Sequence, residues 1–258
     1  MLRSIWIGFD PREGSAYAVA KHSLRRHLIT PIPIRGLVLS ELQSSGLYSR
    51  ETEVRTAPTG DRQLWDVISN APMATEFAIS RFLVPHLANK LVRTVSGRSQ
   101  AQSWALFVDS DVLSRSSVEE IFRAAEQHPE YAVMCVKHNF NPPQGTKMDG
   151  QEQTRYARKN WSSVMLFNVN HPANASLTPE LVNALPGRDL HRFCWLADNE
   201  IGELETGWNY LVGHHTPDDA PVPALVHFTD GIPTMRGYED CEFADEWRAE
   251  LELWAARG

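Results

Sequence analysis

Two carboxylates stand one residue apart where an apolar run ends. Asp109 and Asp111 flank Ser110 and directly follow the four apolar residues 105–108. Carboxylates this close repel each other, and a hard divalent cation such as Mg²⁺, Ca²⁺ or Mn²⁺ relieves that repulsion. The triplet also arises by chance, so the same residues fit a plain loop in which one acid caps the next turn. A metal site is the hypothesis to test.

A histidine occupies a comparable position near the C-terminus. His227 lies in the segment LVHFTDGIP, where a second apolar run ends in a turn that contains Gly231. A neutral imidazole there could add a nitrogen ligand to the acidic pair. The glycine could let the backbone approach a phosphate. A lone histidine at a strand end is more often a core residue, so only the acidic pair favours the ligand interpretation.

Three other polar residues each admit two interpretations. Arg81 is a lone cation within the apolar stretch 75–87, where it would pair with a structural carboxylate or with a diphosphate. Asp10 and Tyr17 border the end of the first apolar run. They fit a nucleotide base and ribose, or equally a cap and a core aromatic.

Two further polar segments each admit a functional and a structural interpretation. The segment KNWSS at 159–163 could hydrogen-bond sugar hydroxyls and offer Trp161 as a stacking face, or it could simply begin a strand. Asp198 and Asn199 offer a carboxylate and an amide, although most such runs are the exposed face of a short helix.

Strands and helices alternate along the chain, and they would position these residues. Apolar runs predict strands at 4–9, 31–39, 104–108, 131–136, 164–169, 208–212 and 224–228. Helical periodicity or caps predict helices at 15–27, 75–87, 116–126, from 179 and over 240–256. The β-α-β opening indicates a parallel sheet covered by helices, in which ligands bind beyond the carboxyl ends of the strands.

Local signals add detail to these elements. Pro85 is expected to break the end of the helix over 75–87. Ser116 and Glu119 have the spacing of a capping box. Residues 44–72 are rich in Ser, Gly, Thr, Arg and Pro, which predicts a long loop of the kind that is usually functional or mobile.

Composition excludes several classes of protein. The chain has 258 residues, of which 42% are hydrophobic and 22% charged, so a packed globular chain is expected rather than a disordered one. A net charge of −7 disfavours a general binder of nucleic acid or anionic membranes. Three cysteines without a CxxC motif indicate reduced thiols. Since no signal-peptide core or membrane-spanning stretch is apparent, we expect a cytoplasmic protein that forms one α/β domain over 1–258.

Six segments occur in an order that points to one family. They are IWIGFD, TEFAISRFLVPHL, WALFVDSD, NWSSVMLFN, ADNEIGELETGWN and HFTDGIP, and they span about residues 4–233. Together they resemble the retaining nucleotide-sugar glycosyltransferases of the GT-A fold, closest to glycosyltransferase family 8 and its glycogenin-like relatives. The resemblance implies a single GT-A domain with a mixed, mostly parallel central sheet flanked by helices. It also implies transfer of a sugar from a nucleotide-diphosphate sugar to an acceptor.

The resemblance implies a role for each matching residue. Asp109, Asp111 and His227 would hold Mn²⁺ or Mg²⁺ against the donor diphosphate. Asp198, with Asn199, would act near the anomeric carbon. The nucleotide sugar would contact a third set, comprising Gly8, Asp10, Tyr17, Arg81, Ser110, Asn160, Ser162 and Gly231. The chain departs from the family where Ile232-Pro233-Thr234 replaces a phosphate-clamping Lys, where Ser163 replaces a Gly, and where Asn199 replaces a Gln.

Two alternatives remain open at this level. A phosphotransferase of the haloacid-dehalogenase type would use Asp109 as nucleophile, with Lys147 or Lys159 and the pair Asp218-Asp219. A non-catalytic nucleotide-sugar-binding module would explain the missing Lys. The acceptor could be a glycan, a lipid, a protein or a small molecule, whereas the net charge disfavours a nucleic acid.

Overall fold

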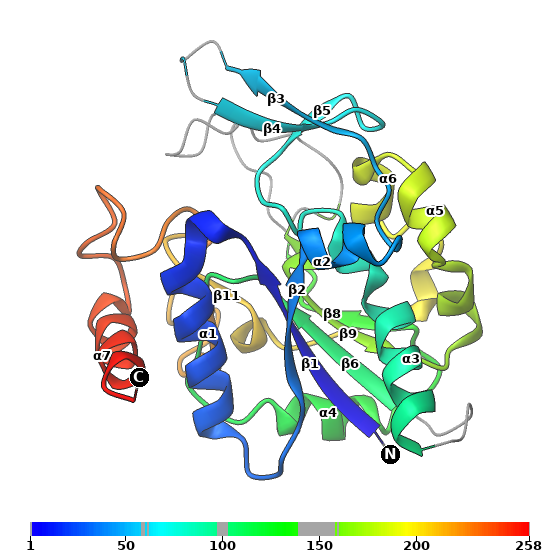
Figure 1. Cartoon of the computed structure of the whole chain (residues 1–258). Helices are drawn as coiled ribbons and strands as arrows, with labels where there is room; N and C mark the ends of the chain where they lie inside the picture. The colour runs from blue at the N-terminus through cyan, green and yellow to red at the C-terminus, as the bar shows by residue number, and fades with distance from the viewer. Residues whose placement is uncertain are drawn as a thin grey trace.

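A six-stranded mixed sheet forms the centre of the molecule. The computed structural model describes residues 2–57, 60, 62–96, 103–138, 158 and 160–257. The strand order is β10-β8-β9-β6-β1-β2 (Figure 1). The strands are β1 (Leu2–Phe9), β2 (Ile34–Val38), β6 (Ser103–Val108), β8 (Val133–Cys135), β9 (Val164–Asn168) and β10 (Ile201–Glu203). β9 runs antiparallel to both of its neighbours, β6 and β8, and the other pairs are parallel. The predicted α/β class and mixed central sheet are confirmed.

Helices cover both faces of this sheet. The described helices are α1 (Gly14–His27), α2 (Leu39–Ser44), α3 (Val84–Ser96), α4 (Glu119–Ala125), α5 (Pro179–Ala184), α6 (Gly187–His191) and α7 (Ala244–Ala255), of which α7 lies outside α1 rather than on the sheet. Strand β6 shows why the sheet needs two covers, because all six of its residues are buried. Ala105 and Phe107 pack into one apolar cluster, whereas Trp104, Leu106 and Val108 pack into the other. Because successive side chains of a strand point to opposite faces of the sheet, one apolar run contributes to two hydrophobic cores.

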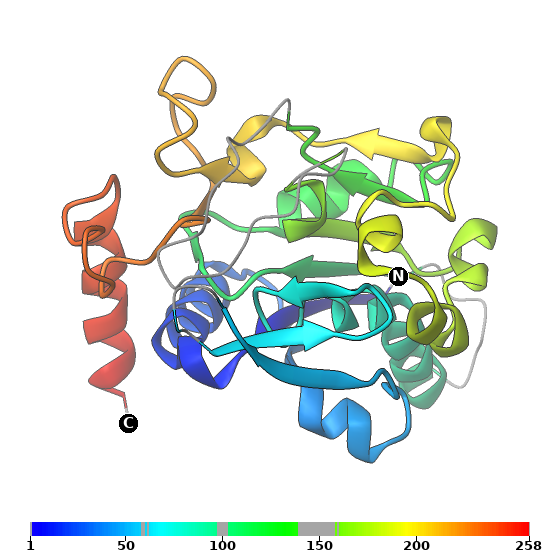
Figure 2. The ribbon, with the colours of Figure 1, turned by 90° about the horizontal axis from the view of Figure 1, so that it is seen from above.

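Two smaller sheets flank the central one. The first, in the order β11-β12-β7, joins β7 (Val112–Ser114), β11 (Tyr210–Leu211) and β12 (Leu225–His227). The second joins β3 (Thr52–Thr56), β4 (Arg62–Asp66) and β5 (Ala71–Met73) in antiparallel order. Figure 1 shows the β3–β5 sheet above the central sheet, and Figure 2 shows it from above, lying across the ends of the central strands.

The prediction of a long loop over residues 44–72 was therefore wrong. The segment forms most of the β3–β5 sheet. In β4 two of the five residues are buried, and in β3 none is. A buried ion pair between Arg50 and Asp66 anchors it, with 2.5 Å between Nη2 and Oδ2. A sheet with so little apolar surface has no alternating pattern to reveal it in the sequence.

Two local expectations were also wrong. The stretch 75–87 begins as turns and a 3₁₀ helix over Ser80–Leu83, and α3 then starts at Val84. Pro85 therefore stands in the first turn of a helix, where its missing N–H costs nothing. Glu119 does not complete a capping box: its Oε1 accepts hydrogen bonds from the backbone N–H groups of Ile29 and Thr30 instead (2.8 and 2.7 Å).

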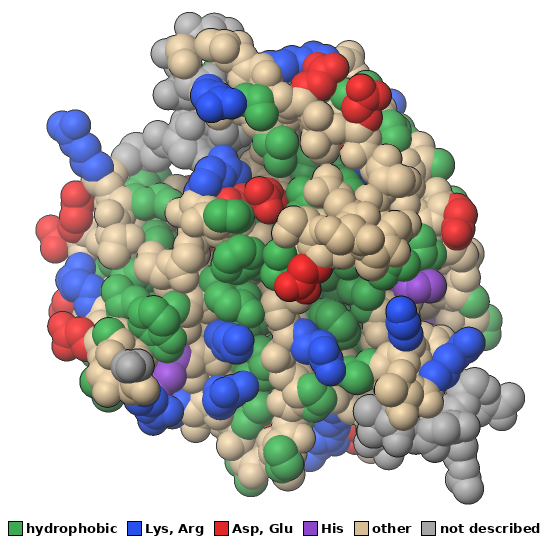
Figure 3. All heavy atoms as spheres, viewed as in Figure 1, with side chains coloured by type: hydrophobic (Ala, Val, Ile, Leu, Met, Phe, Trp, Pro, Cys, Tyr) green, Lys and Arg blue, Asp and Glu red, His purple; other side chains and the backbone are tan. Residues whose placement is uncertain are grey.

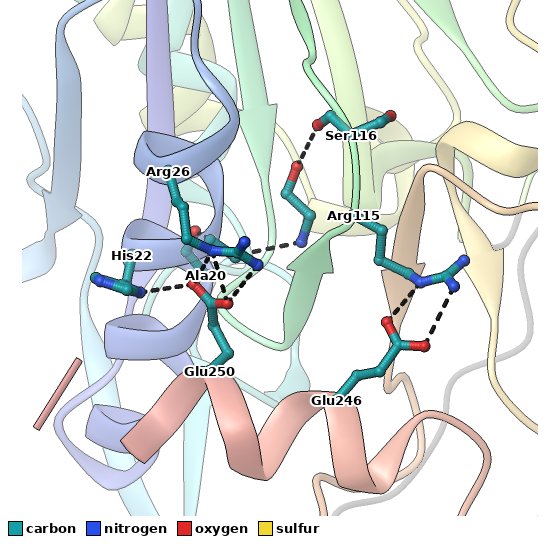
Figure 4. A network of polar contacts seen from close by, with 9 residues as sticks. Ala20, His22, Arg26, Arg115, Ser116, Glu246 and Glu250 are labelled. Atoms are coloured by element: carbon teal, nitrogen blue, oxygen red, sulfur yellow. Dashed lines mark hydrogen bonds and ion pairs between the residues drawn. The ribbon is translucent and has the colours of Figure 1, made fainter. Parts of the chain in front are cut away.

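Helix α7 packs against α1. Trp247 of α7 is fully buried. Glu250, which is only 2% exposed, lies 2.6 Å from Nδ1 of His22 and 2.7 Å from Nη2 of Arg26. Figure 4 shows these contacts, with Glu246 and Arg115 paired alongside them. Trp254, in the last turn of α7, is 47% exposed.

The surface adds two observations. Among the helices that the structure describes, none combines the length and the apolar character needed to cross a membrane. On the face shown in Figure 3, basic side chains are spread among hydrophobic and uncharged groups.

Candidate active site

A cavity of about 470 Å³ lies between the β3–β5 sheet and the carboxyl end of β6. Residues 69–75 line one side, and residues 227–232 line another. Seven residues predicted from the sequence are on its wall, namely Arg81, Asp109, Asp111, Asn160, Ser162, His227 and Gly231. The cavity is thus where an open α/β sheet usually binds its ligand.

The three predicted metal ligands meet in this cavity. One ligand atom from each of Asp109, Asp111 and His227 lies within 4.8 Å of the others. Strand pairing causes the convergence, because β7 begins directly after Asp111 and pairs antiparallel with β12, so that His227 stands opposite Val112. The predicted convergence is confirmed. Two carboxylates and an imidazole are a donor set suited to a divalent cation.

Arg81 contacts the acidic pair directly. Its Nη1 lies 2.8 Å from Oδ1 of Asp109 and also donates to the carbonyl of Ser162 at 2.8 Å. The Arg81 side chain is only 6% exposed. Of the two partners considered for this cation, the structure shows the carboxylate. The ion pair holds Asp109 in place and neutralises part of the negative charge of the cavity.

A third carboxylate, Glu13, was missed in the sequence analysis. It lies on the cavity wall, and its Oε2 accepts a hydrogen bond from Oγ of Ser110 at 2.5 Å. Burial, and next the negative charge of Asp111, raise the pKa of Glu13 to about 7, against the opposing effect of the Ser110 hydrogen bond. The sequence did contain a signal for this residue. Glu13 closely follows β1, and the carboxyl end of β1 lies beside that of the parallel strand β6, which leads to Asp109. A cavity this rich in carboxylates fits a bound cation.

The metal-free protein is expected to lose stability as pH rises from about 5 to 7, in part through Glu13. The carboxyl keeps its proton to about pH 7 when folded, whereas the unfolded chain releases it near its ordinary pKa of 4.5. The folded state therefore binds more protons in this window, and the free energy of unfolding falls by at most about 1.4 kcal/mol per pH unit. Glu13→Gln should flatten this dependence in urea unfolding measured with EDTA. The exposed Glu252→Gln is the control, and equal slopes for Glu13→Gln and wild type would contradict the assignment.

Asn209 lies behind the three predicted metal ligands and was also missed. Its side chain is fully buried, and its Oδ1 lies 2.9 Å from Nδ1 of His227. Its Nδ2 lies 2.8 Å from Nε2 of His138 and 2.9 Å from Oγ of Ser163. Burial, and then the positive charges that His215 and His227 carry when protonated, lower the pKa of His138 to about 3. His138 is therefore neutral at physiological pH.

Four residues predicted to bind the nucleotide sugar are not on the wall of the cavity. Asp10 is fully buried and accepts hydrogen bonds from Arg12 and from the backbone N–H of Glu76 at 3.0 Å. Burial opposes ionisation of Asp10, but these bonds outweigh it and hold its pKa below the ordinary value. The others are Gly8, Tyr17 and Ser110, and their contacts to the donor stay predictions.

Packing explains the positions of these residues. A Cβ on Gly8 would collide with the ring of Phe77. Tyr17 meets Phe9 edge to face, with ring centroids 5.1 Å apart. Gly231 does lie on the wall, but its N–H donates to the carbonyl of Phe228 at 3.1 Å.

The two predicted catalytic residues lie away from the described wall. Asp198 begins a 3₁₀ helix over Asp198–Glu200, its side chain is 90% exposed, and it is ion-paired with Arg158. Asn199 is exposed beside it. The structure does not bring either residue to the cavity, and their catalytic roles stay predictions.

Comparison with known proteins places this site in context. A scan against models of known families gives no match. The chain is 41% identical over 251 residues to protein CDI of Arabidopsis thaliana, in an alignment that covers 96% of this chain and 85% of that protein.

Solved structures share the fold at low identity. A bifunctional glycosyltransferase, WbbM, superposes with a TM-score of 0.59 at 14% identity, over 97% of this chain and 49% of that one. The glycosyltransferase GlyE of Streptococcus pneumoniae gives 0.55 at 12%, over 100% and 64%. An active-site mutant of LgtC gives 0.54 at 15%, over 97% and 95%. The chain spans about half of WbbM and under two thirds of GlyE. The molecule therefore has the GT-A glycosyltransferase fold, and the chain belongs to the family of the Arabidopsis protein CDI.

Proposed function

We propose that this protein is a metal-dependent glycosyltransferase that moves a sugar, a hexose in the simplest case, from a nucleotide-diphosphate donor to an acceptor hydroxyl with retention. The observation that carries the proposal is the convergence of Asp109, Asp111 and His227 in a cavity of the GT-A fold. LgtC, which shares this fold, is a galactosyltransferase solved with donor and acceptor sugar analogues. Residues 1–258 would form one such domain and act in the cytoplasm.

The three converging side chains would hold Mn²⁺ or Mg²⁺. When bound, such an ion acts as a Lewis acid toward the leaving diphosphate, which supplies several kcal/mol of transition-state stabilisation. Arg81 keeps Asp109 oriented through its ion pair. Asn160 and Ser162, on the wall beside the acidic pair, would contact the donor sugar or diphosphate. Gly231 would lie close to a phosphate, and Ser110 would support the site through Glu13.

The remaining roles rest on the resemblance. Gly8, Asp10 and Tyr17 would shape the surroundings of the base and ribose, although they do not line the described cavity. Asp198, with Asn199, would stabilise positive charge on the sugar ring through its carboxylate. Since Asp198 is exposed in this conformation, that role requires the segment to approach the cavity when the donor binds.

One alternative keeps a specific observation in its favour. The segment after His227 carries Ile232-Pro233-Thr234 where the glycogenin-like enzymes that the sequence resembles have a Lys. This departure favours a nucleotide-sugar-binding module without turnover. The haloacid-dehalogenase alternative is not retained, because the fold is that of GT-A glycosyltransferases. Its candidates Lys147 and Lys159 lie outside the described residues, and Asp219 accepts a hydrogen bond from the N–H of Thr216 at 2.8 Å.

A thermal-shift screen of sugar nucleotides with and without Mn²⁺ tests the proposal. A donor at about 100 times its Kd stabilises the folded state by about 2.7 kcal/mol, so the correct nucleotide should raise Tm by several degrees. The shift should require Mn²⁺ and disappear with EDTA. Release of nucleoside diphosphate by the same mixture then separates an enzyme from a binding module. If no sugar nucleotide shifts Tm with Mn²⁺ present, the proposed function is wrong.

A further inference from the structure

We infer that Ser163 and Asn209 form a hydrogen-bond relay that fixes which ring nitrogen of His227 carries the proton. Its consequence for metal binding rests on the proposed function, but the tautomer itself does not. The relay begins at the backbone carbonyl of Asn160 and ends at Nδ1 of His227. Each link follows from which atoms can donate a proton and which can only accept one.

The first link sets the direction of the relay. Oγ of Ser163 lies 2.7 Å from the carbonyl oxygen of Asn160. A carbonyl can only accept, so the single hydroxyl proton of Ser163 points to it. Oγ of Ser163 must then accept from its other neighbour, the Asn209 side chain at 2.9 Å.

The second link orients the buried amide. An atom that donates to Ser163 must be the amide nitrogen of Asn209, and its second proton reaches Nε2 of His138 at 2.8 Å. The carbonyl of Asn160 lies farther from the same nitrogen, at 3.4 Å, and also favours this orientation of the amide. The amide oxygen therefore faces His227, at 2.9 Å from Nδ1. A flipped amide would place its oxygen against Oγ of Ser163, whose proton is already committed to Asn160.

The third link gives the tautomer of His227. Because the amide oxygen only accepts, Nδ1 of His227 must carry a proton, and in the neutral ring Nε2 then presents a lone pair. Nε2 lies 3.2 Å from Oδ1 of Asp111, so it donates to this carboxylate when the ring is doubly protonated, and its lone pair faces the acidic pair when the ring is neutral. A nitrogen ligand needs that lone pair, and an outer partner on the other nitrogen is the usual means of orienting it. Asn209 and Ser163 are thus positioning residues for the ligand.

The relay also gives a role to a departure from the family pattern. The resemblance places a Gly where this chain has Ser163. Glycine has no hydroxyl and could not orient Asn209 in this way. The Ser163 hydroxyl therefore sets the direction of the hydrogen bonds that place the His227 proton on Nδ1.

The test combines tautomer and metal binding in the full chain. In ¹⁵N-histidine NMR of the metal-free wild type, with the signal assigned by loss in His227→Gln, we expect His227 to carry its proton on Nδ1. Ser163→Ala lets the amide flip and should give a mixture of tautomers. Asn209→Asp, whose carboxylate only accepts, should keep the proton on Nδ1.

Mn²⁺ affinity measured by electron paramagnetic resonance gives the second readout. Asn209→Leu and Ser163→Ala should weaken binding about 10-fold or more, since outer partners are typically worth about 10–100-fold. Asn209→Asp should bind at least as well as the wild type. The matched control is Ser23→Ala, a buried serine of α1 that donates to the carbonyl of Ala20 (3.2 Å) and accepts from the N–H of Ser114 (3.0 Å), away from the cavity.

The possible outcomes separate this inference from the proposed function. A neutral wild-type ring that carries its proton on Nε2 and none on Nδ1, or unchanged tautomer and Mn²⁺ affinity in both Ser163→Ala and Asn209→Leu, overturns the relay. If the wild type binds no Mn²⁺ but the tautomer still depends on Ser163, the relay stands and the proposed function fails.

Discussion

Asp111→Asn is expected to abolish binding of Mn²⁺ at micromolar to millimolar concentrations of the ion and to lower the rate of sugar transfer at least about 100-fold. The substitution removes one of the two proposed carboxylate ligands and half of their formal charge. The amide of the new side chain has nearly the same shape as the carboxylate that it replaces. Loss of about 3 kcal/mol of Lewis-acid stabilisation corresponds to about two decades in rate. Mn²⁺ titration by electron paramagnetic resonance and release of nucleoside diphosphate measure the two effects.

The metal-free variant distinguishes a lost ligand from a damaged fold. Glu13 and Asp111 repel each other in the wild type, which is part of the reason why the pKa of Glu13 is raised. Asp111→Asn removes this repulsion, so its Tm in EDTA should equal or exceed that of the wild type. Asp245→Asn, on a side chain that is 97% exposed on α7, is the control with normal metal binding. Full Mn²⁺ binding by Asp111→Asn would remove Asp111 from the ligand set.

Arg50→Met is expected to destabilise the protein by about 3–5 kcal/mol, the usual cost of leaving one member of a buried ion pair alone. The Arg50 and Asp66 side chains are both 0% exposed. Arg50 also donates to the carbonyls of Val182 and Leu185, each at 2.7 Å, and so ties the β3–β5 sheet to α5. Urea unfolding followed by tryptophan fluorescence measures the loss.

The pair also predicts how stability depends on acid. Burial opposes ionisation of Asp66, but hydrogen bonds from Arg50 and Ser69 outweigh it and hold its pKa below the ordinary value of 3.8. Its contribution is therefore present above about pH 4 and is lost as pH falls through the lowered pKa.

A second substitution tests the cause. Arg50→Met combined with Asp66→Asn should recover part of the loss, because no buried charge is left alone. The control is Arg55→Met, in an exposed pair with Glu53, which should cost under about 1 kcal/mol. A loss this small for Arg50→Met as well would show that the buried pair does not anchor the sheet.

Much of the fold was predictable because the signals are local. The apolar run that becomes β6 is buried on both faces and leads directly to Asp109, so a strand and the polar turn after it could be inferred together. The helix predicted from residue 179 is likewise α5, where Oγ1 of the N-cap Thr178 accepts from the N–H of Leu181 at 3.2 Å. The β3–β5 sheet could not be inferred, because ladder hydrogen bonds and one ion pair hold it and only isolated residues such as Leu64 and Met73 join the core, so that no strand shows an alternating apolar pattern.

By itself, the amino-acid sequence determined the two carboxylates after β6 and a histidine in a similar turn, because residue type and adjacency are properties of the chain. Only the tertiary structure decided that these side chains meet, since β7 and β12 pair across more than a hundred residues. It also decided that Glu13, Ser163 and Asn209 surround them and that Asp198 stands apart. Hydrogen-bond direction and the crowding of charge depend on distances between remote segments, which no local pattern of residues specifies.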